Sequence, residues 1–91
     1  MNMEVIVNLH LKNRCIETEA RSEFNRLMET YFKTDDLEGE LDDKIELLRD
    51  FLDGSDFRKL RSSDIRLTGT TESDVIIKRN NKAGAIVLEV F

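Results

Sequence analysis

The stretch VIIKRNNKAGAIVLEVF, residues 75–91, decides the fold of this 91-residue chain. Two apolar runs, 75–77 and 86–91, flank a polar loop at 80–84 that contains two asparagines and a glycine. Apolar runs joined by a short loop of this composition predict an antiparallel hairpin. The second run is apolar on both faces, so we expect it to lie centrally in the sheet or beneath the helices of the fold.

The N-terminal part of the chain predicts a further strand, because apolar and polar residues alternate over 3–12 with Ile6 as the exception. The apolar spacing then changes to three and four residues over about 17–33, and again over about 37–53. This spacing predicts two consecutive amphipathic helices. Side-chain oxygens at 34–36 are available to cap the second helix, and Gly54 is expected to follow its last residue.

Residues 57–72 have no clear period and favour either one or two short strands or a short helix. The chain has no linker-like stretch and no internal repeat. We therefore predict a single α+β domain over 1–91. It consists of an N-terminal strand, two consecutive amphipathic helices and a mainly antiparallel set of strands ending in a C-terminal hairpin.

Charge is distributed unevenly along the chain. The net charge is -5, but residues 35–56 hold ten acids against only Lys44 and Arg49, an excess of eight negative charges. The rest of the chain has nine acids and twelve bases, and is therefore weakly basic. A local excess of this size favours cations or basic partners at the acidic segment.

Carboxylates follow the outer face of the second predicted helix. Acids at its C-terminal end meet the negative end of the helix dipole and free backbone carbonyls, an oxygen-rich environment of the kind that Ca²⁺ prefers. We predict that this surface weakly binds a divalent cation, with Ca²⁺ preferred. The predicted ligands are Asp42, Glu46, Asp50, Asp53 and Asp56.

An ordinary solvated acidic helix face accounts for the same pattern without any ligand. An EF-hand loop fits around neither Gly39 nor Gly54, because the position of its bidentate Glu is then Ile45 or Leu60. Glu72 or Asp74 would be additional ligands if the fold brought them to this surface. Since like charges repel along the helix, we also expect Asp50→Asn or Asp53→Asn to raise stability.

The remaining residues offer little catalytic chemistry. His10 and Cys15 are too few for a usual zinc site, and they would form a thiolate–imidazole pair only if the turn after the first strand brought them together. Otherwise Cys15 enters the first helix as a small apolar residue, and His10 is an exposed strand residue. No nucleophile, acid/base pair or cofactor loop is recognisable, and we predict a protein that is not an enzyme.

The alternative function is an interaction module. It would dock a basic protein through the same acidic face, or bind nucleic acid through basic residues in the C-terminal part of the chain. Nucleic acid is the weaker option, because aromatic residues for base stacking are lacking. The chain shows no secretory signal and no apolar run of membrane length, so we expect a cytoplasmic protein without a membrane partner. The basic residues in question are Arg58, Lys59, Arg61, Arg66, Lys78, Arg79 and Lys82.

The chain is short, acidic and free of proline, with two helices between a first strand and a C-terminal antiparallel set. In this plan it resembles the small uncharacterised α+β proteins of archaeal genomes. The resemblance spans the whole chain as architecture and composition. Some small acidic proteins of that kind bind Ca²⁺ through clustered carboxylates outside EF-hands, so the resemblance implies calcium binding without assigning ligands.

Overall fold

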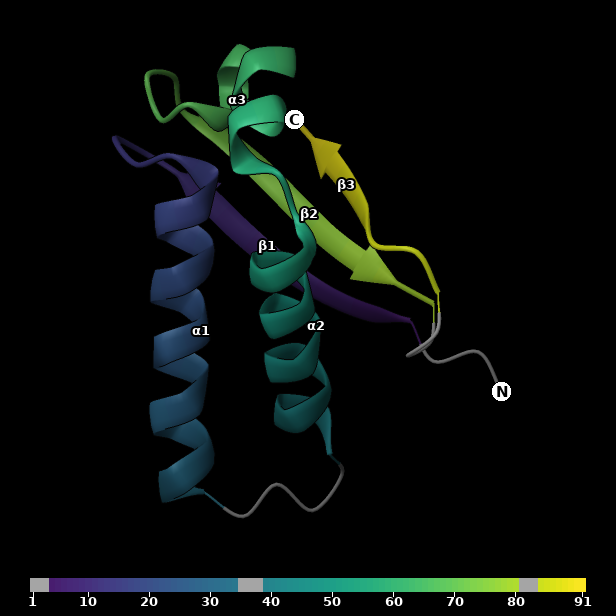
Figure 1. Cartoon of the computed structure of the whole chain (residues 1–91). Helices are drawn as coiled ribbons and strands as arrows, with labels where there is room; N and C mark the ends of the chain where they lie inside the picture. Colours follow the sequence, from purple (N-terminus) through teal and green to yellow (C-terminus); the bar gives the residue numbers. More distant parts are fainter. Residues whose placement is uncertain (1–3, 35–38, 81–83) are drawn as a thin grey trace.

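Three antiparallel strands form one sheet in a computed structural model that describes residues 4–34, 39–80 and 84–91. The strands are β1 (Val5–Leu11), β2 (Ser73–Arg79) and β3 (Val87–Val90), in the order β1-β2-β3 (Figure 1). The α+β class and the C-terminal hairpin are confirmed. Alternation along β1 is confirmed as well, because Val7, Leu9 and Leu11 are buried while the residues between them are exposed.

The prediction that the last strand lies centrally in the sheet is wrong. β2 is the central strand, since it pairs with β1 on one side and with β3 on the other. Val75 and Ile77 of β2 are fully buried, whereas Val87 of β3 is 47% exposed. Apolar residues on both faces of β3 therefore did not determine its position in the sheet. How deeply a strand is buried depends on how many strands and helices lie against it.

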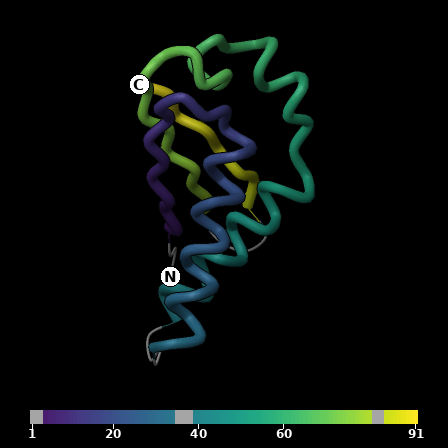
Figure 2. Tube along the Cα trace, turned by 90° about the vertical axis from the view of Figure 1, so that its left-hand side faces the viewer, coloured from purple at the N-terminus to yellow at the C-terminus, as the bar shows by residue number. Residues whose placement is uncertain are grey.

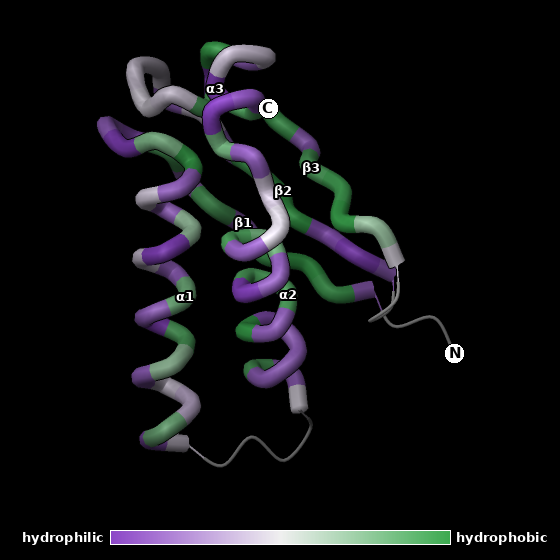
Figure 3. Tube along the Cα trace, in the orientation of Figure 1, coloured by the Kyte–Doolittle hydropathy of each residue, from purple (hydrophilic) through white to green (hydrophobic). Residues whose placement is uncertain are grey.

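Two antiparallel helices, α1 (Ile16–Lys33) and α2 (Glu40–Gly54), cover one face of the sheet (Figures 1 and 2). Figure 3 shows apolar and polar residues alternating around both helices, as expected for amphipathic elements. Between the two layers lies a core to which both helices and two strands contribute. Its largest fully buried side chains are Leu11, Ile16, Leu47, Leu48, Phe51, Val75 and Ile77.

The ends of α2 differ slightly from the prediction. The helix begins at Glu40, directly after Gly39, whose φ of 73° is a left-handed conformation that suits glycine. Thr34 instead follows the last residue of α1, and the other two expected caps lie outside the described residues. Gly54 is the last helical residue and Ser55 is the cap, so the predicted end is one residue early.

The irregular segment is helical, which decides between the two alternatives that its sequence left open. α3 (Phe57–Ser63) begins after Asp56, whose side chain accepts a hydrogen bond of 3.2 Å from the backbone N–H of Lys59. A short 3-10 helix, η1 (Ile65–Leu67), follows. The rings of Phe57 and Phe51 pack edge to face, with 5.4 Å between their centroids, and this contact holds the start of α3 against α2. In the described ranges, no helix has the length and apolar character needed to cross a membrane.

The loop before β2 passes very close to the turn before α1. Gly69 adopts a φ of 84°, and a Cβ atom at this position would lie 2.3–2.7 Å from backbone atoms of Arg14 and Cys15. The close approach therefore requires glycine both for its backbone conformation and for the absence of a side chain.

Candidate metal site

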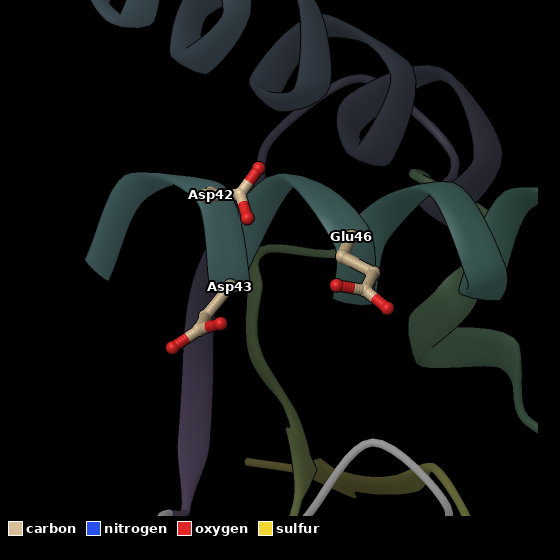
Figure 4. Close-up of side chains that lie close together, drawn as sticks. All are labelled: Asp42, Asp43 and Glu46. Carbon is tan, nitrogen blue, oxygen red and sulfur yellow. The ribbon is translucent and has the colours of Figure 1, made fainter. Parts of the chain in front are cut away.

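Three carboxylates converge in the N-terminal half of α2. Asp42, Asp43 and Glu46 each place one oxygen so that the three oxygens lie within 4.8 Å of one another (Figure 4). The helix itself brings them together, because Glu46 follows Asp42 by four residues and Asp43 by three. Over residues 4–34, 39–80 and 84–91, no other group of three His, Cys, Asp or Glu side chains converges in this way.

The spacing of these oxygens is short enough for a single cation to contact all three. Two oxygens on opposite sides of one Ca²⁺ lie about 4.6–5.2 Å apart, twice the usual Ca–O distance. The oxygens of Asp42, Asp43 and Glu46 fall within this limit. Asp42 is exposed while Asp43 and Glu46 are half-buried, so water has access to complete the coordination.

Only two of the five predicted ligands belong to this cluster. Asp42 and Glu46 were expected, while Asp43 was not among the predicted ligands, because the prediction favoured the acids towards the C-terminal end of the helix. The other three predicted ligands, Asp50, Asp53 and Asp56, lie towards the C-terminal end of α2 or beyond it. The structure therefore moves the centre of the carboxylate cluster towards the start of the helix.

Asp50 is the partner of a buried arginine. Its Oδ2 accepts a hydrogen bond of 2.9 Å from Nη1 of Arg79, the last residue of β2, which is only 6% exposed. Arg49 lies 3.8 Å from its other oxygen. This pair argues against the expectation that Asp50→Asn relieves repulsion and raises stability, because the carboxylate of Asp50 neutralises a buried charge.

Asp56 and Asp53 have different surroundings. Asp56 caps α3 through the backbone N–H of Lys59, so its carboxylate is used in ordering the next helix. Asp53 lines a shallow hollow between α1 and α2, together with Arg21 and Arg49. The last turn of α2 itself contains no basic residue, so the cations that share this hollow come from α1 and from the preceding turn of α2. These two carboxylates therefore do not join the cluster at the start of the helix.

Glu72 and Asp74 meet His10 rather than α2. Asp74 is paired directly with His10 across β1 and β2, and its Oδ1 lies 2.6 Å from Nδ1 of the imidazole. Oε1 of Glu72 lies 3.0 Å from Nε2. Hydrogen bonding to Asp74 is the main cause that raises the pKa of His10, with Glu72 contributing. Since both ring nitrogens are occupied, this exposed histidine has no nitrogen left for a metal.

Cys15 has partners of its own near the start of α1. Its Sγ lies 3.3 Å from the hydroxyl of Thr18 and 4.0 Å from Nη1 of Arg61. Hydrogen bonding by Thr18 lowers the pKa of the thiol, with Arg61 adding a smaller effect. Because His10 is held by Asp74, the two residues do not form a thiolate–imidazole pair. Cys15 is the N-cap residue of α1, so it stands at the helix entrance as expected.

Most of the predicted phosphate-binding residues have acidic partners. The guanidinium of Arg61 donates to Glu17 at 3.4 Å, and that of Arg66 donates to Asp64 at 2.7 Å. Lys78 pairs with Glu89 on β3, and Arg79 is buried against Asp50. Lys82 lies outside the described residues. These pairs lower the positive charge that the C-terminal strands present to a polyanion.

Comparison with known proteins places the chain among relatives over nearly its full length. A protein-family model matches residues 3–89. An uncharacterised protein of Archaeoglobus fulgidus is 40% identical over 79 residues, which cover 85% of this chain and 88% of that protein. No solved structure matches the chain. The similarity therefore extends over most of both proteins rather than over a short motif.

Proposed function

The chain belongs to the family of small archaeal α+β proteins represented by its Archaeoglobus relative, and we propose that it is a non-enzymatic protein that weakly binds a divalent cation. The observation that carries the proposal is the convergence of Asp42, Asp43 and Glu46, whose oxygens lie within 4.8 Å of one another. The ion would be held on the acidic surface of α2, with water completing its coordination.

Ca²⁺ suits this cluster better than Mg²⁺. Mg²⁺ demands near-ideal octahedral geometry and gives up its water reluctantly. Ca²⁺ accepts irregular coordination by about six to eight oxygens. Three carboxylates on one face of a single helix therefore favour the ion with the less strict geometry.

Weak binding follows from the position of the cluster. All three carboxylates lie on α2, and Asp42 is exposed, so the ion would be enclosed on one side only. The positive end of the helix dipole also lies nearby and opposes a cation. We expect a dissociation constant on the order of 10⁻⁴ to 10⁻³ M, as in other open calcium sites. A cytoplasmic location is part of the proposal, because the free thiol of Cys15 suits a reducing compartment.

Titration of the chain with CaCl₂ and with MgCl₂, followed by backbone amide NMR, tests this proposal. Saturable shifts centred on 42–46 are expected, with tighter binding of Ca²⁺ than of Mg²⁺. Glu46→Gln should weaken Ca²⁺ binding, whereas the matched variant Asp53→Asn, on the same helix, should leave it unchanged. Absence of saturable shifts up to about 10⁻² M Ca²⁺, ten times the weak end of open sites, would contradict the proposal.

A further inference from the structure

A hollow of about 590 Å³ lies along the free edge of β1. Its lining includes Val5, which shares the helix-covered face of the strand with Val7, and also Ile6 and Asn8, which lie on the opposite face. A hollow that reaches both faces of one strand must pass along its edge. β2 occupies the other edge of β1, so this hollow lies on the side where the described residues provide no neighbouring strand.

The free edge of β1 is regular enough to accept another strand. Its register with β2 runs without interruption from Val5 to Leu11, and the chain contains no proline. A strand edge of this kind presents backbone N–H and C=O groups that are suited to pair with an extended chain. Ile6 and Asn8 project from the uncovered face here, where many edge strands carry a protective charge.

The side of the hollow that faces β1 is formed by the start of α2 and is acidic. It is formed by Glu40, Asp43 and Lys44 at the start of α2, and Glu4 adds a further carboxylate beside the strand. Lys44 lies 3.6 Å from Glu40, so these two charges offset each other. The remaining carboxylates, Glu4 and Asp43, give the hollow a negative balance that favours basic side chains.

We propose that the free edge of β1 binds an extended, basic peptide segment of a partner protein, which adds to the sheet as a fourth strand. Main-chain hydrogen bonds to β1 would supply affinity. Lysine or arginine at alternate positions would place positive charges beside Asp43 and Glu4, because alternate residues of a strand point to the same face. This inference does not depend on cation binding, although the two share Asp43.

A single extended segment fits this edge better than a second copy of the chain. Figures 1 and 2 show α1 and α2 crossing the sheet and extending well past it. A second copy that paired its own β1 here would bring two more long helices into this space. A single extended segment brings no helices with it. The part of β1 that lines the hollow, residues 5–8, is as long as about 13 Å of extended chain.

The probe is a blocked synthetic peptide of about eight residues in which lysine and valine alternate, a length that spans the hollow with a margin at each end. It is added to the isotope-labelled chain in EDTA, so that no divalent cation takes part. We expect saturable amide shifts at 5–8 and 40–44, and slower hydrogen exchange in β1. Replacing both Glu40 and Asp43 by their amides, Glu40→Gln with Asp43→Asn, should weaken binding several-fold, and Asp53→Asn should not.

Two control peptides separate strand addition from general attraction between opposite charges. The same sequence with glutamate in place of lysine should not bind. The lysine peptide N-methylated at alternate residues keeps its charge but loses main-chain donors, and should bind about tenfold more weakly. Equal binding of the methylated and unmethylated peptides would overturn the proposal.

The remaining outcomes are also decisive. Peptide binding in EDTA together with no response to Ca²⁺ supports strand addition and rejects only the cation proposal. A response to Ca²⁺ without peptide binding rejects strand addition alone. Sedimentation of the free chain as a dimer, with protected β1 amides and no peptide binding, would mean that a second copy occupies the edge, and would overturn the proposal.

Discussion

Arg79 brings a positive charge into the protein interior, and Asp50 is the residue that neutralises it. Both charges are evident in the sequence, but their pairing is not, because 29 residues separate them and the contact depends on how β2 passes α2. The sequence argument for Asp50 considered only its neighbours on the same helix. A partner from another element reverses the sign of the expected stability effect.

We expect Asp50→Asn to lower the free energy of unfolding by about 1–3 kcal/mol, because the buried guanidinium of Arg79 loses its charged partner. The matched variant Asp53→Asn removes a carboxylate from the unfavourable end of the same helix. It should leave stability unchanged or raise it by about 0.3–1 kcal/mol. Urea denaturation of both variants measures the difference, and equal effects would argue against the Asp50–Arg79 pair.

His10 should make stability depend on pH. Its folded pKa is raised above the ordinary 6.5, so its stabilising contribution is complete below that value and is lost as the pH rises through the folded pKa. We therefore expect the difference in Tm between the natural chain and His10→Gln to be largest near about pH 6 and to shrink as the pH rises through the folded pKa of His10.

The only histidine of the chain also gives a direct measurement of its own pKa by NMR. Asp74→Asn should lower that pKa more than Glu72→Gln does, because the hydrogen bond to Asp74 is the largest cause of the shift. A His10 pKa that does not respond to Asp74→Asn would contradict the geometry described here.

At the scale of elements, periodicity predicted what each segment becomes but not where it lies. The alternation of β1 and the stripes of α1 and α2 are local patterns, and all three elements form as expected. The place of β3 at the sheet edge depends instead on the pairing of β1 with the other edge of β2, which local sequence does not encode. Residues 57–67 are helical because Asp56 and Asp64 cap two short turns, a signal that apolar spacing alone does not reveal.

The close approach of two loops gives a test at this scale. Gly69→Ala should lower the free energy of unfolding by at least about 2 kcal/mol, because its Cβ would collide with the backbone of Arg14 and its φ of 84° is strained for alanine. Gly54→Ala is the matched control. No atom lies within 4 Å of the added methyl group, and the position is helical, so stability should stay the same or rise by up to about 1 kcal/mol. Thermal denaturation distinguishes the two.

For the whole molecule, composition and pattern were sufficient to predict the α+β class and an acidic surface on the second helix. They were not sufficient to locate the candidate site, because capping by Asp56 and pairing of Asp50 emerge only when α3 and β2 are in place. The hollow along the free edge of β1 was not predicted either. It is formed jointly by Val5, Ile6 and the start of α2, which are far apart in the sequence.

The pairing of β1 with β2 has a consequence for the newborn chain. The ribosome makes β1 before its partner strand β2, which begins at Ser73. β1 therefore has no strand to pair with while residues 11–73 are synthesised. At about 5–20 residues per second this delay is about 3–12 s. During that time the apolar face of β1 has no sheet to join, and only α1 and α2 are available to cover it. The emerging protein is therefore most exposed to aggregation, and to chaperones, before β2 has been translated.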